Sequence, residues 1–267
     1  MLRTLITCLC YLFAAPLAAH EFWIEAQPWQ VQPDAPVAAT LHNGQEFEGS
    51  EIAYFDRRIA RFGRLHDGAI VDYEGRNGDN PAFQADTLPE GLHVLAYESA
   101  PQRVTYDDFE AFARFGDHKD LGPFRTLHAN RGLPEADFVE AYTRFAKALI
   151  AVGDGAGVDR AVGLDHEFVA LDNPYTDDLS DGMRLQLFRF GAPRGDAQVE
   201  LFRRAEDGSV EITLHRTDEN GIVTLSVEPG YEYLADAVIL FEPSEAMAEA
   251  SGAVWETDWA ALTWAVP

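Results

Sequence analysis

Residues 217–239, TDENGIVTLSVEPGYEYLADAVI, contain two strand-like segments, each introduced by a turn signal. The polar segment 217–221 ends in glycine and is typical of a tight turn, and residues 222–227 that follow are rich in β-branched side chains. Pro229-Gly230 is a second turn signal, after which residues 231–239 have the composition of another strand. This turn–strand–turn–strand pattern predicts an antiparallel β unit.

The same stretch resembles the carboxypeptidase-regulatory and transthyretin-like sandwiches. In those, a Thr-Asp-x-x-Gly turn precedes an alternating strand and then a Pro-Gly-x-Tyr strand. The resemblance implies a transthyretin-like β-sandwich for residues 153–267, which begin at the glycine-rich segment 153–157. A fold-level resemblance of this kind carries no information about function.

The C-terminus is unusually aromatic. Leu262, Trp264 and Val266 alternate with smaller residues, a spacing that can finish a sheet. We expect Trp255, Trp259 and Trp264 to pack in the core, because tryptophan is first a large apolar residue. A sugar-binding aromatic face is the alternative.

Residues 20–103 also contain short strands separated by turns. Residues 37–42 are predicted to form a strand that the turn signal Asn43-Gly44 closes. Residues 92–97 form a second predicted strand, directly after the turn Pro89-Glu90-Gly91. Strands at this spacing predict a small antiparallel, Ig-like sandwich.

Residues 104–152 have a different pattern, which predicts a helical insert. One helix is expected over residues 106–115, where phenylalanines recur every three residues after Thr105 as N-cap. A second helix is expected to begin at Pro134. It carries aromatic and aliphatic residues at three- or four-residue spacing, namely Phe138, Tyr142, Phe145 and Leu149. The fold class expected is therefore mainly β, with two small antiparallel β-sandwich units and a helical insert between them.

Residues 1–19 are predicted to be a cleaved signal peptide. Arg3 precedes an apolar run, and Pro16-Leu17-Ala18-Ala19 ends in the small residue that signal peptidase needs. The run is too short to span a membrane. Both cysteines, Cys8 and Cys10, lie within it, so the mature chain has neither disulfides nor thiolate ligands. We expect a periplasmic protein that is not embedded in the membrane after cleavage.

The mature chain is strongly acidic. Removal of Arg3 reduces Lys+Arg from 20 to 19 against 45 Asp+Glu, which gives a net charge of 19 − 45 = −26. Such a surface repels nucleic acid and raises the local concentration of cations. Nucleic acid is therefore excluded as an expected partner, whereas a metal ion is compatible with the charge.

Cleavage after Ala19 would make His20 the first residue of the mature protein. An N-terminal histidine offers a metal both its α-amine and its imidazole, and the amine is available near neutral pH. Nitrogen donors of this kind suit Ni²⁺, Co²⁺, Cu²⁺ and Zn²⁺. We therefore expect His20 to be the principal metal ligand.

The further ligands have to come from other parts of the chain, because there is no His-x-His or His-Glu-x-x-His motif. His93, which follows a turn near the start of a predicted strand, is the first choice, and His42, at the end of a predicted strand, is the second. In the alternative interpretation, His20 is only the residue left by cleavage and the other histidines are incidental.

No sequence pattern indicates an enzyme. There is no Gly-x-Ser-x-Gly, phosphate loop or dinucleotide fingerprint, and 45 acidic residues produce carboxylate pairs by chance. We therefore expect no catalytic residues and no enzymatic activity.

Several segments, in the same order along the chain, resemble a bacterial domain-of-unknown-function family of periplasmic proteins. This NikM-like family is described as the periplasmic component of nickel and cobalt uptake systems. The segments that carry the resemblance are residues 19–25 (AHEFWIE), 57–62 (RRIARF), 91–99 (GLHVLAYES), 142–149 (YTRFAKAL), 172–175 (DNPY) and 258–264 (DWAALTW). Members often carry a histidine near position 237, where this chain has Asp236-Ala237-Val238-Ile239.

The resemblance implies a periplasmic protein that binds Ni²⁺, Co²⁺ or Cu²⁺ and presents it to a membrane metal-uptake permease, with His20 and His93 at family positions. A histidine-brace copper oxidase that acts on polysaccharide is the enzymatic alternative, and it requires an aromatic surface near His20, such as Trp23 and Trp29 could form. The third hypothesis is a structural or ligand-binding β-sandwich module that binds no metal.

Overall fold

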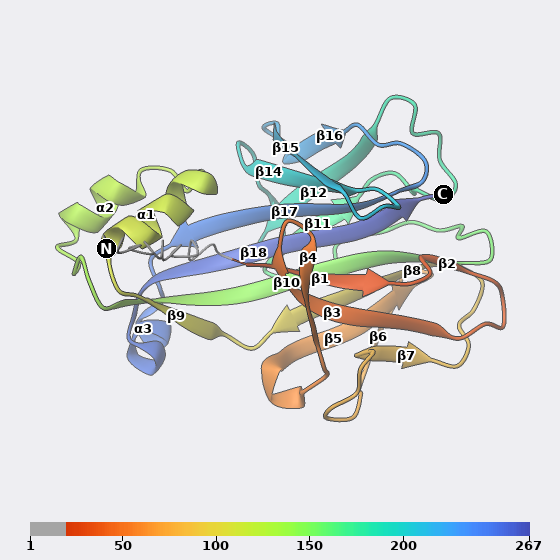
Figure 1. The fold of residues 1–267 in the computed structure, drawn as a ribbon, viewed down its shortest axis with the longest axis horizontal. Coiled ribbons are helices and arrows are strands. Elements are labelled where there is room, and N and C mark those ends of the chain that lie inside the picture. Colours follow the sequence, from red (N-terminus) through yellow and green to blue (C-terminus); the bar gives the residue numbers. More distant parts are fainter. Residues whose placement is uncertain (1–19) are drawn as a thin grey trace, which may run out of the picture.

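A computed structural model describes residues 20–267, and the predicted signal peptide, residues 1–19, lies outside the described residues. Within the described range the protein consists of three sheets, three α-helices and one short 3₁₀ turn, Asp56–Arg58 (Figure 1). The predicted mainly β class is confirmed.

The central sheet has ten strands. They are β2 (Gln30–Val31), β5 (Ile59–His66), β6 (Ala69–Asp72), β8 (Gly91–Ser99), β9 (Gln102–Tyr106), β10 (Phe138–Val152), β14 (Gln198–Arg204), β15 (Val210–Arg216), β17 (Tyr231–Phe241) and β18 (Ala253–Val266). Their order is β15-β14-β17-β18-β10-β8-β5-β6, and β2 and β9 also pair with β10. The long strands β17, β18 and β10 lie side by side, with β10 and β18 parallel (Figure 1).

Two smaller sheets cover the two faces of the central sheet. The first flanking sheet comprises β1 (Glu21–Ala26), β3 (Val37–Gln45), β4 (Glu48–Ile52) and β7 (Phe83–Ala85). The second flanking sheet comprises β11 (His166–Ala170), β12 (Met183–Arg189), β13 (Ala192–Pro193) and β16 (Ile222–Leu225). Neighbouring residues of β10 divide between the two layers, because Ala148 packs in one core with β1 and Leu149 packs in the other with β12. The result is a three-layer β structure.

The helices are α1 (Phe109–His118), α2 (Phe124–Asn130) and α3 (Glu245–Ser251). Helices α1 and α2 lie at one end of the long central strands, where their aromatic side chains form a third core with Trp255 and Trp259 (Figure 1). The helix predicted over residues 106–115 is confirmed with a shift of three residues. Asp108, rather than Thr105, caps it by accepting a hydrogen bond from the backbone N–H of Ala111. None of the described helices is long and apolar enough to cross a membrane.

The second predicted helix is wrong, because the residues after Pro134 form strand β10. Every residue from Thr143 to Val152 is buried, since flanking sheets cover both faces of this strand. A strand buried on both faces loses the two-residue alternation by which a strand is recognised. The helical spacing of its large side chains was therefore coincidental, and tertiary pairing with β18 and β8 overrides the helix propensity of its alanines.

Strand β3 continues beyond the predicted turn at Asn43-Gly44 and ends at Gln45. The turn lies instead at Glu46 and Phe47, which have φ values of 54° and 63°. Glycine is required at position 44 by the close approach of β4, because a Cβ there would lie 1.9 Å from the carbonyl oxygen of Glu48.

The strands predicted at both ends of residues 217–239 are present as β16 and β17, and the C-terminal strand is β18. The central sheet joins strands that precede and follow the expected boundary at residue 153. The division into a sandwich at residues 20–103, an insert at 104–152 and a sandwich at 153–267 stays a prediction, apart from the strand in place of the second helix.

Candidate functional site

A row of polar side chains crosses one face of the central sheet close to the start of β1. Glu200 of β14 lies opposite Asp236 of β17, and Trp259 of β18 lies opposite Arg144 of β10. On each of these strands a residue two positions away packs against the first flanking sheet, namely Phe202, Leu234, Ala261 and Ala146. Because side chains alternate between the faces of a sheet, all four residues of the row lie on that same face.

The ammonium group of Lys119 lies within this row. Its Nζ atom is 3.0 Å from Oε1 of Glu21, 2.8 Å from Oε2 of Glu200 and 2.9 Å from Oδ2 of Asp236. All four side chains are buried, with at most 5% of any of them exposed. Lys119 directly follows α1 and Glu21 is the first residue of β1, so this cluster joins the helical end of the molecule to the first flanking sheet.

The charges of the cluster stabilise one another. Burial alone would lower the pKa of Lys119, but the three carboxylates raise it well above its usual value. Burial raises the pKa of Asp236 to about 6 despite the neighbouring ammonium. Burial also favours the neutral form of Glu200, but hydrogen bonds from His118 and Lys119 lower its pKa.

The same three carboxylates are the one group in residues 20–267 whose ligand atoms come close enough, within 4.8 Å of one another, to bind a metal ion. The ammonium of Lys119 occupies the space between them. In this arrangement the triad of Glu21, Glu200 and Asp236 is a buried salt-bridge network, with no histidine among its members.

Arg144 adds a second cation next to the cluster. Its guanidinium lies 3.8 Å from the ring of Trp259, which also stacks on the ring of Phe115 and has the ammonium of Lys119 at 5.0 Å. The Nε and Nη1 atoms of Arg144 are buried without a hydrogen-bond partner among the described residues, and burial lowers the pKa of this side chain. Nearby, burial raises the pKa of Glu140 to about 6, although it accepts hydrogen bonds from Tyr106 and Thr257.

His118, the last residue of α1, lies at the rim of the cluster. Its side chain is 64% exposed, and its Nε2 atom is 3.3 Å from Oε1 of Glu200. The hydrogen bond to Glu200 raises the pKa of His118. His118 is not among the ligands predicted from the sequence. The available signal was its position beside Lys119, one of only two lysines in a very acidic chain.

His20 lies immediately before β1 and is exposed. It lines an open surface hollow together with residues of the β3–β4 hairpin, namely Asn43, Gly44, Gln45, Glu46, Glu48, Gly49, Ser50 and Ile52. The hollow therefore combines an imidazole with carboxylate, amide and hydroxyl oxygens.

His93 lies elsewhere and is fully buried. Its ring stacks on that of His66 at 4.1 Å, its Nδ1 atom is 2.7 Å from Nη1 of Arg64, and its Nε2 atom is 2.7 Å from the carbonyl oxygen of Pro89. Burial lowers its pKa to about 4. Both ring nitrogens of His93 are thus engaged within the protein.

The structure does not bring His20 and His93 together. The hydroxyl of Thr263 donates to the backbone carbonyls of both Ile24 in β1 and Lys147 in β10. Ile24 and Lys147 therefore lie side by side, at the same position along the strand direction. His20 lies four residues before Ile24, and His93 pairs with Ile150, three residues beyond Lys147. At about 3.3 Å a residue, the seven residues separate the two histidines by roughly 20 Å along the strands.

His42 is also separated from His20. Its ring stacks on Trp23 at 5.2 Å, and its Nε2 atom is 2.7 Å from the hydroxyl of Thr40. Because His42 pairs with Trp23, three residues after His20, the two histidines are about 10 Å apart along the chain direction of β1. Burial lowers the pKa of His42.

The tryptophans are core residues. Trp255, Trp259 and Trp264 are at most 3% exposed, which confirms the predicted packing role. Trp23 and Trp29 are also buried and hydrogen-bonded to Glu25 and Glu232, so they do not form an aromatic surface around His20.

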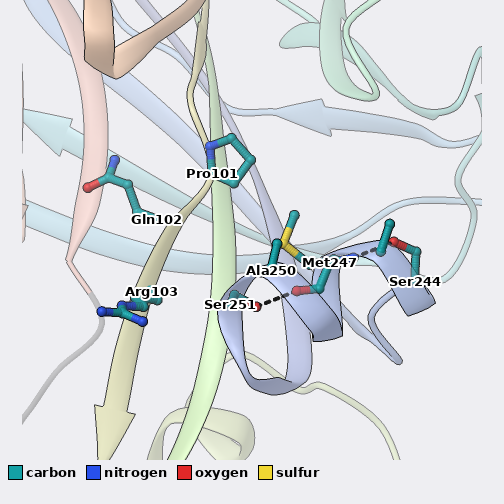
Figure 2. A pocket seen from close by; sticks show the side chains of 8 residues that line it. Pro101, Gln102, Arg103, Ser244, Met247, Ala250 and Ser251 are labelled. Carbon is teal, nitrogen blue, oxygen red and sulfur yellow. Dashed lines mark hydrogen bonds between the residues drawn. The ribbon is translucent and has the colours of Figure 1, made fainter.

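A groove between β9 and α3 is the remaining recess of note. Figure 2 shows Pro101, Gln102 and Arg103 on one side and the helix with Met247 on the other. Its lining contains no histidine and no carboxylate side chain. The groove therefore offers neither a metal site nor an acid–base pair.

A family described as "Domain of unknown function (DUF4198)" matches residues 17–240. No curated protein matches the sequence. One similar solved structure is described as "Crystal structure of tetra-tandem repeat in extending region of large adhesion protein". The two chains are 10% identical, and their structures superpose with a TM-score of 0.22. The match covers 92% of this chain and 49% of the adhesion-protein chain, so this chain spans about half the length of that one. A TM-score of this size supports no argument about fold or function.

Proposed function

The chain belongs to the DUF4198 family of domains of unknown function, and we propose that it captures a transition metal ion in the periplasm for a membrane uptake system. The metal would be bound at the mature N-terminus by the α-amine and imidazole of His20. His118, in place of His93, would supply the third nitrogen.

One observation carries this proposal. His20 and His118 each directly precede a member of the same buried salt bridge, because Glu21 and Lys119 are 3.0 Å apart. Because this bridge runs through two long side chains, it connects the segments that carry the two histidines at one end of the molecule but does not fix the distance between them. His20 precedes the first paired residue of β1, so strand pairing does not fix its side chain.

The surroundings of His118 are typical of a histidine that binds a metal. Metal-binding histidines commonly donate one ring N–H to a carboxylate, which orients the ring and makes the other nitrogen a better donor. The Nε2 atom of His118 lies beside Glu200, and its Nδ1 atom has no protein partner among the described residues. Glu200 is in turn held by Lys119, so the orienting group is itself fixed.

The chemistry of the donors selects the class of metal. An amine and two imidazoles favour Ni²⁺, Co²⁺ or Cu²⁺ over the oxygen-loving Mg²⁺ and Ca²⁺. The mature net charge of −26 and the glutamates of the hollow, Glu46 and Glu48, would attract cations to this end of the molecule. A nickel or cobalt uptake permease is the partner that the family resemblance suggests.

No observation favours the copper oxidase over simple binding. The aromatic surface that this alternative requires is not supplied by Trp23 or Trp29, which are buried. A module without any metal stays the competing hypothesis, and the experiment below separates the two.

Calorimetric titration with Ni²⁺, Co²⁺ and Cu²⁺ tests the proposal on four proteins. They are residues 20–267 beginning at His20, the same chain with one extra N-terminal glycine, His118→Ala and the control His215→Ala. His215 is a partly exposed histidine on β15, whose Nε2 atom bonds only to Thr213. We expect the extension and His118→Ala each to weaken binding at least about tenfold, and the control to bind normally. Equal affinity for all four proteins would refute metal capture at this terminus.

A further inference from the structure

The second of the two lysines in the chain, Lys147, lies against a carboxyl group in a fully buried pocket. It belongs to β10, and its Nζ atom is 2.8 Å from Oδ1 and 2.9 Å from Oδ2 of Asp159. The side chains are 1% and 0% exposed. A third ionisable group, Glu167 of β11, is 1% exposed and has Oε2 at 3.7 Å from the same nitrogen.

We propose that Lys147 and Asp159 condense to an amide bond, which cross-links β10 to the segment that follows it. The proposal is independent of metal binding, because the pair lies on the face of β10 opposite to Arg144 and its cluster. Lysine is the side chain whose amine can form such a bond, and this one is held in contact with its acceptor.

The surroundings favour a neutral product over the charged pair. Two carboxylates and one ammonium are buried together here, which leaves an excess negative charge in a water-excluded site. Buried charges carry a desolvation cost that pairing offsets only in part. Condensation removes one positive and one negative charge, and the exclusion of water opposes hydrolysis of the product.

Glu167 can carry the proton. For reaction, the ammonium of Lys147 passes one proton to the carboxylate of Asp159, and the neutral Nζ then attacks Cγ. Glu167 takes the second proton from nitrogen and delivers it to the leaving hydroxyl, so the C–O bond breaks and one water molecule leaves. Its present distance of 3.7 Å exceeds a hydrogen bond, as is common for acid–base groups before reaction.

Backbone groups are in place to stabilise the intermediate. The N–H of Ala170 donates to Oδ2 of Asp159 at 2.8 Å, and the N–H of Arg160 donates to Oδ1 at 2.8 Å. Fixed donors of this kind stabilise negative charge that develops on a carbonyl oxygen. The carbonyl oxygens of Phe168 and Arg160 accept from Nζ at 2.9 and 3.2 Å and hold the amine in position.

The bond would give the exported chain a covalent constraint without cysteine. Its two cysteines, Cys8 and Cys10, both lie in the predicted signal peptide. A cross-link between residues 147 and 159 would restrict the unfolded chain in the manner of a short disulfide loop. Reducing conditions would not break it.

Mass spectrometry of the denatured wild-type protein tests the proposal. Trypsin cuts after lysine and arginine, and residues 145–160 lie between Arg144 and Arg160. We expect a single peptide 145–160 that is lighter than its sequence by one water and is not cut at Lys147. Separate peptides 145–147 and 148–160 at their full masses would overturn the proposal.

Lys119 provides an internal control. After denaturation, an amine-reactive reagent is expected to label Lys119 and leave Lys147 unlabelled, whereas labelling of both would overturn the cross-link. Loss of water at an aspartate alone, such as Asp154 before Gly155, would leave Lys147 open to both trypsin and reagent.

The role of Glu167 is tested by Glu167→Gln, which keeps the size of the side chain, with Glu256→Gln on β18 as the matched control. We expect freshly purified Glu167→Gln protein to contain peptides cut at Lys147, and the control to be fully cross-linked. Complete cross-linking in Glu167→Gln would overturn the assignment of Glu167 as proton carrier.

Discussion

Replacement of Lys119 by methionine tests the buried cluster most strongly. The side chain keeps nearly the same shape, but the three carboxylates of Glu21, Glu200 and Asp236 lose the ammonium that lies 2.8–3.0 Å from each of them. Removing one partner of a buried ion pair typically destabilises a protein by about 3–5 kcal/mol, because the remaining charge stays buried and unpaired. We expect a loss at the upper end of this range at pH 7, since three carboxylates lose their partner together.

The loss should depend on pH in a defined direction. Lys119 lowers the pKa values of Glu200 and Asp236, so its removal raises both in the folded state. The folded variant then binds more protons than the unfolded chain and gains stability as the pH falls. Urea denaturation of wild type and Lys119→Met at pH 7 and pH 5 measures both effects. The control is Arg125→Met, which removes the same charge from an exposed pair with Asp117 on the surface, where a much smaller loss is expected. A loss in Lys119→Met no larger than in the control, or one that grows as the pH falls, would refute the reasoning.

Three further predictions concern other parts of the molecule. Gly116→Ala should destabilise the contact between α1 and α2 by about 1–3 kcal/mol in urea denaturation, because the new Cβ would lie 2.5 Å from ring atoms of Phe124; an unchanged midpoint would contradict this. Burial raises the pKa of Glu140 to about 6, so the protonated side chain stabilises the folded state at low pH and this stabilisation is lost as the pH rises through 6. Glu140→Gln should remove this part of the pH dependence of the unfolding free energy, measured by denaturation from pH 4 to 7. Burial lowers the pKa of His93 to about 4, so this side chain should stay neutral above pH 5 in an NMR titration. A titration midpoint near 6.5 would contradict its burial.

Much of the fold follows from local patterns in the sequence. Strands with alternating or β-branched residues bounded by turn signals were identified, as in β3, β8, β16 and β17. The prediction failed at β10, which is the most deeply buried strand. Alternation requires one solvent-facing side, and this strand has none between Thr143 and Val152, so its pattern could not distinguish a strand from a helix.

Local sequence patterns also do not predict which strands, distant along the chain, pair with one another. The central sheet places β18 between β17 and β10, although the end of β10 at Val152 and the start of β18 at Ala253 are far apart along the chain. Such contacts are set by the packing of three layers, which a single sequence does not display.

The candidate site was predictable only in part. The chemistry of His20 depends on its own position in the chain and could be inferred from the sequence alone. The second ligand could not be inferred in this way, because only the tertiary structure shows which histidine lies at the same end of the molecule as the start of β1. The structure turns His93 inward against His66, whereas α1 carries His118 to the salt bridge between Lys119 and Glu21.

Electron paramagnetic resonance of the copper-loaded protein counts the nitrogen donors directly, with Cu²⁺ as the probe. For residues 20–267 beginning at His20, nitrogen hyperfine structure from three donors is expected, and His118→Ala should show one nitrogen fewer. One extra N-terminal glycine should change the spectrum again, because it displaces the α-amine from His20. A spectrum that is the same in all three proteins would contradict metal capture by His20 and His118.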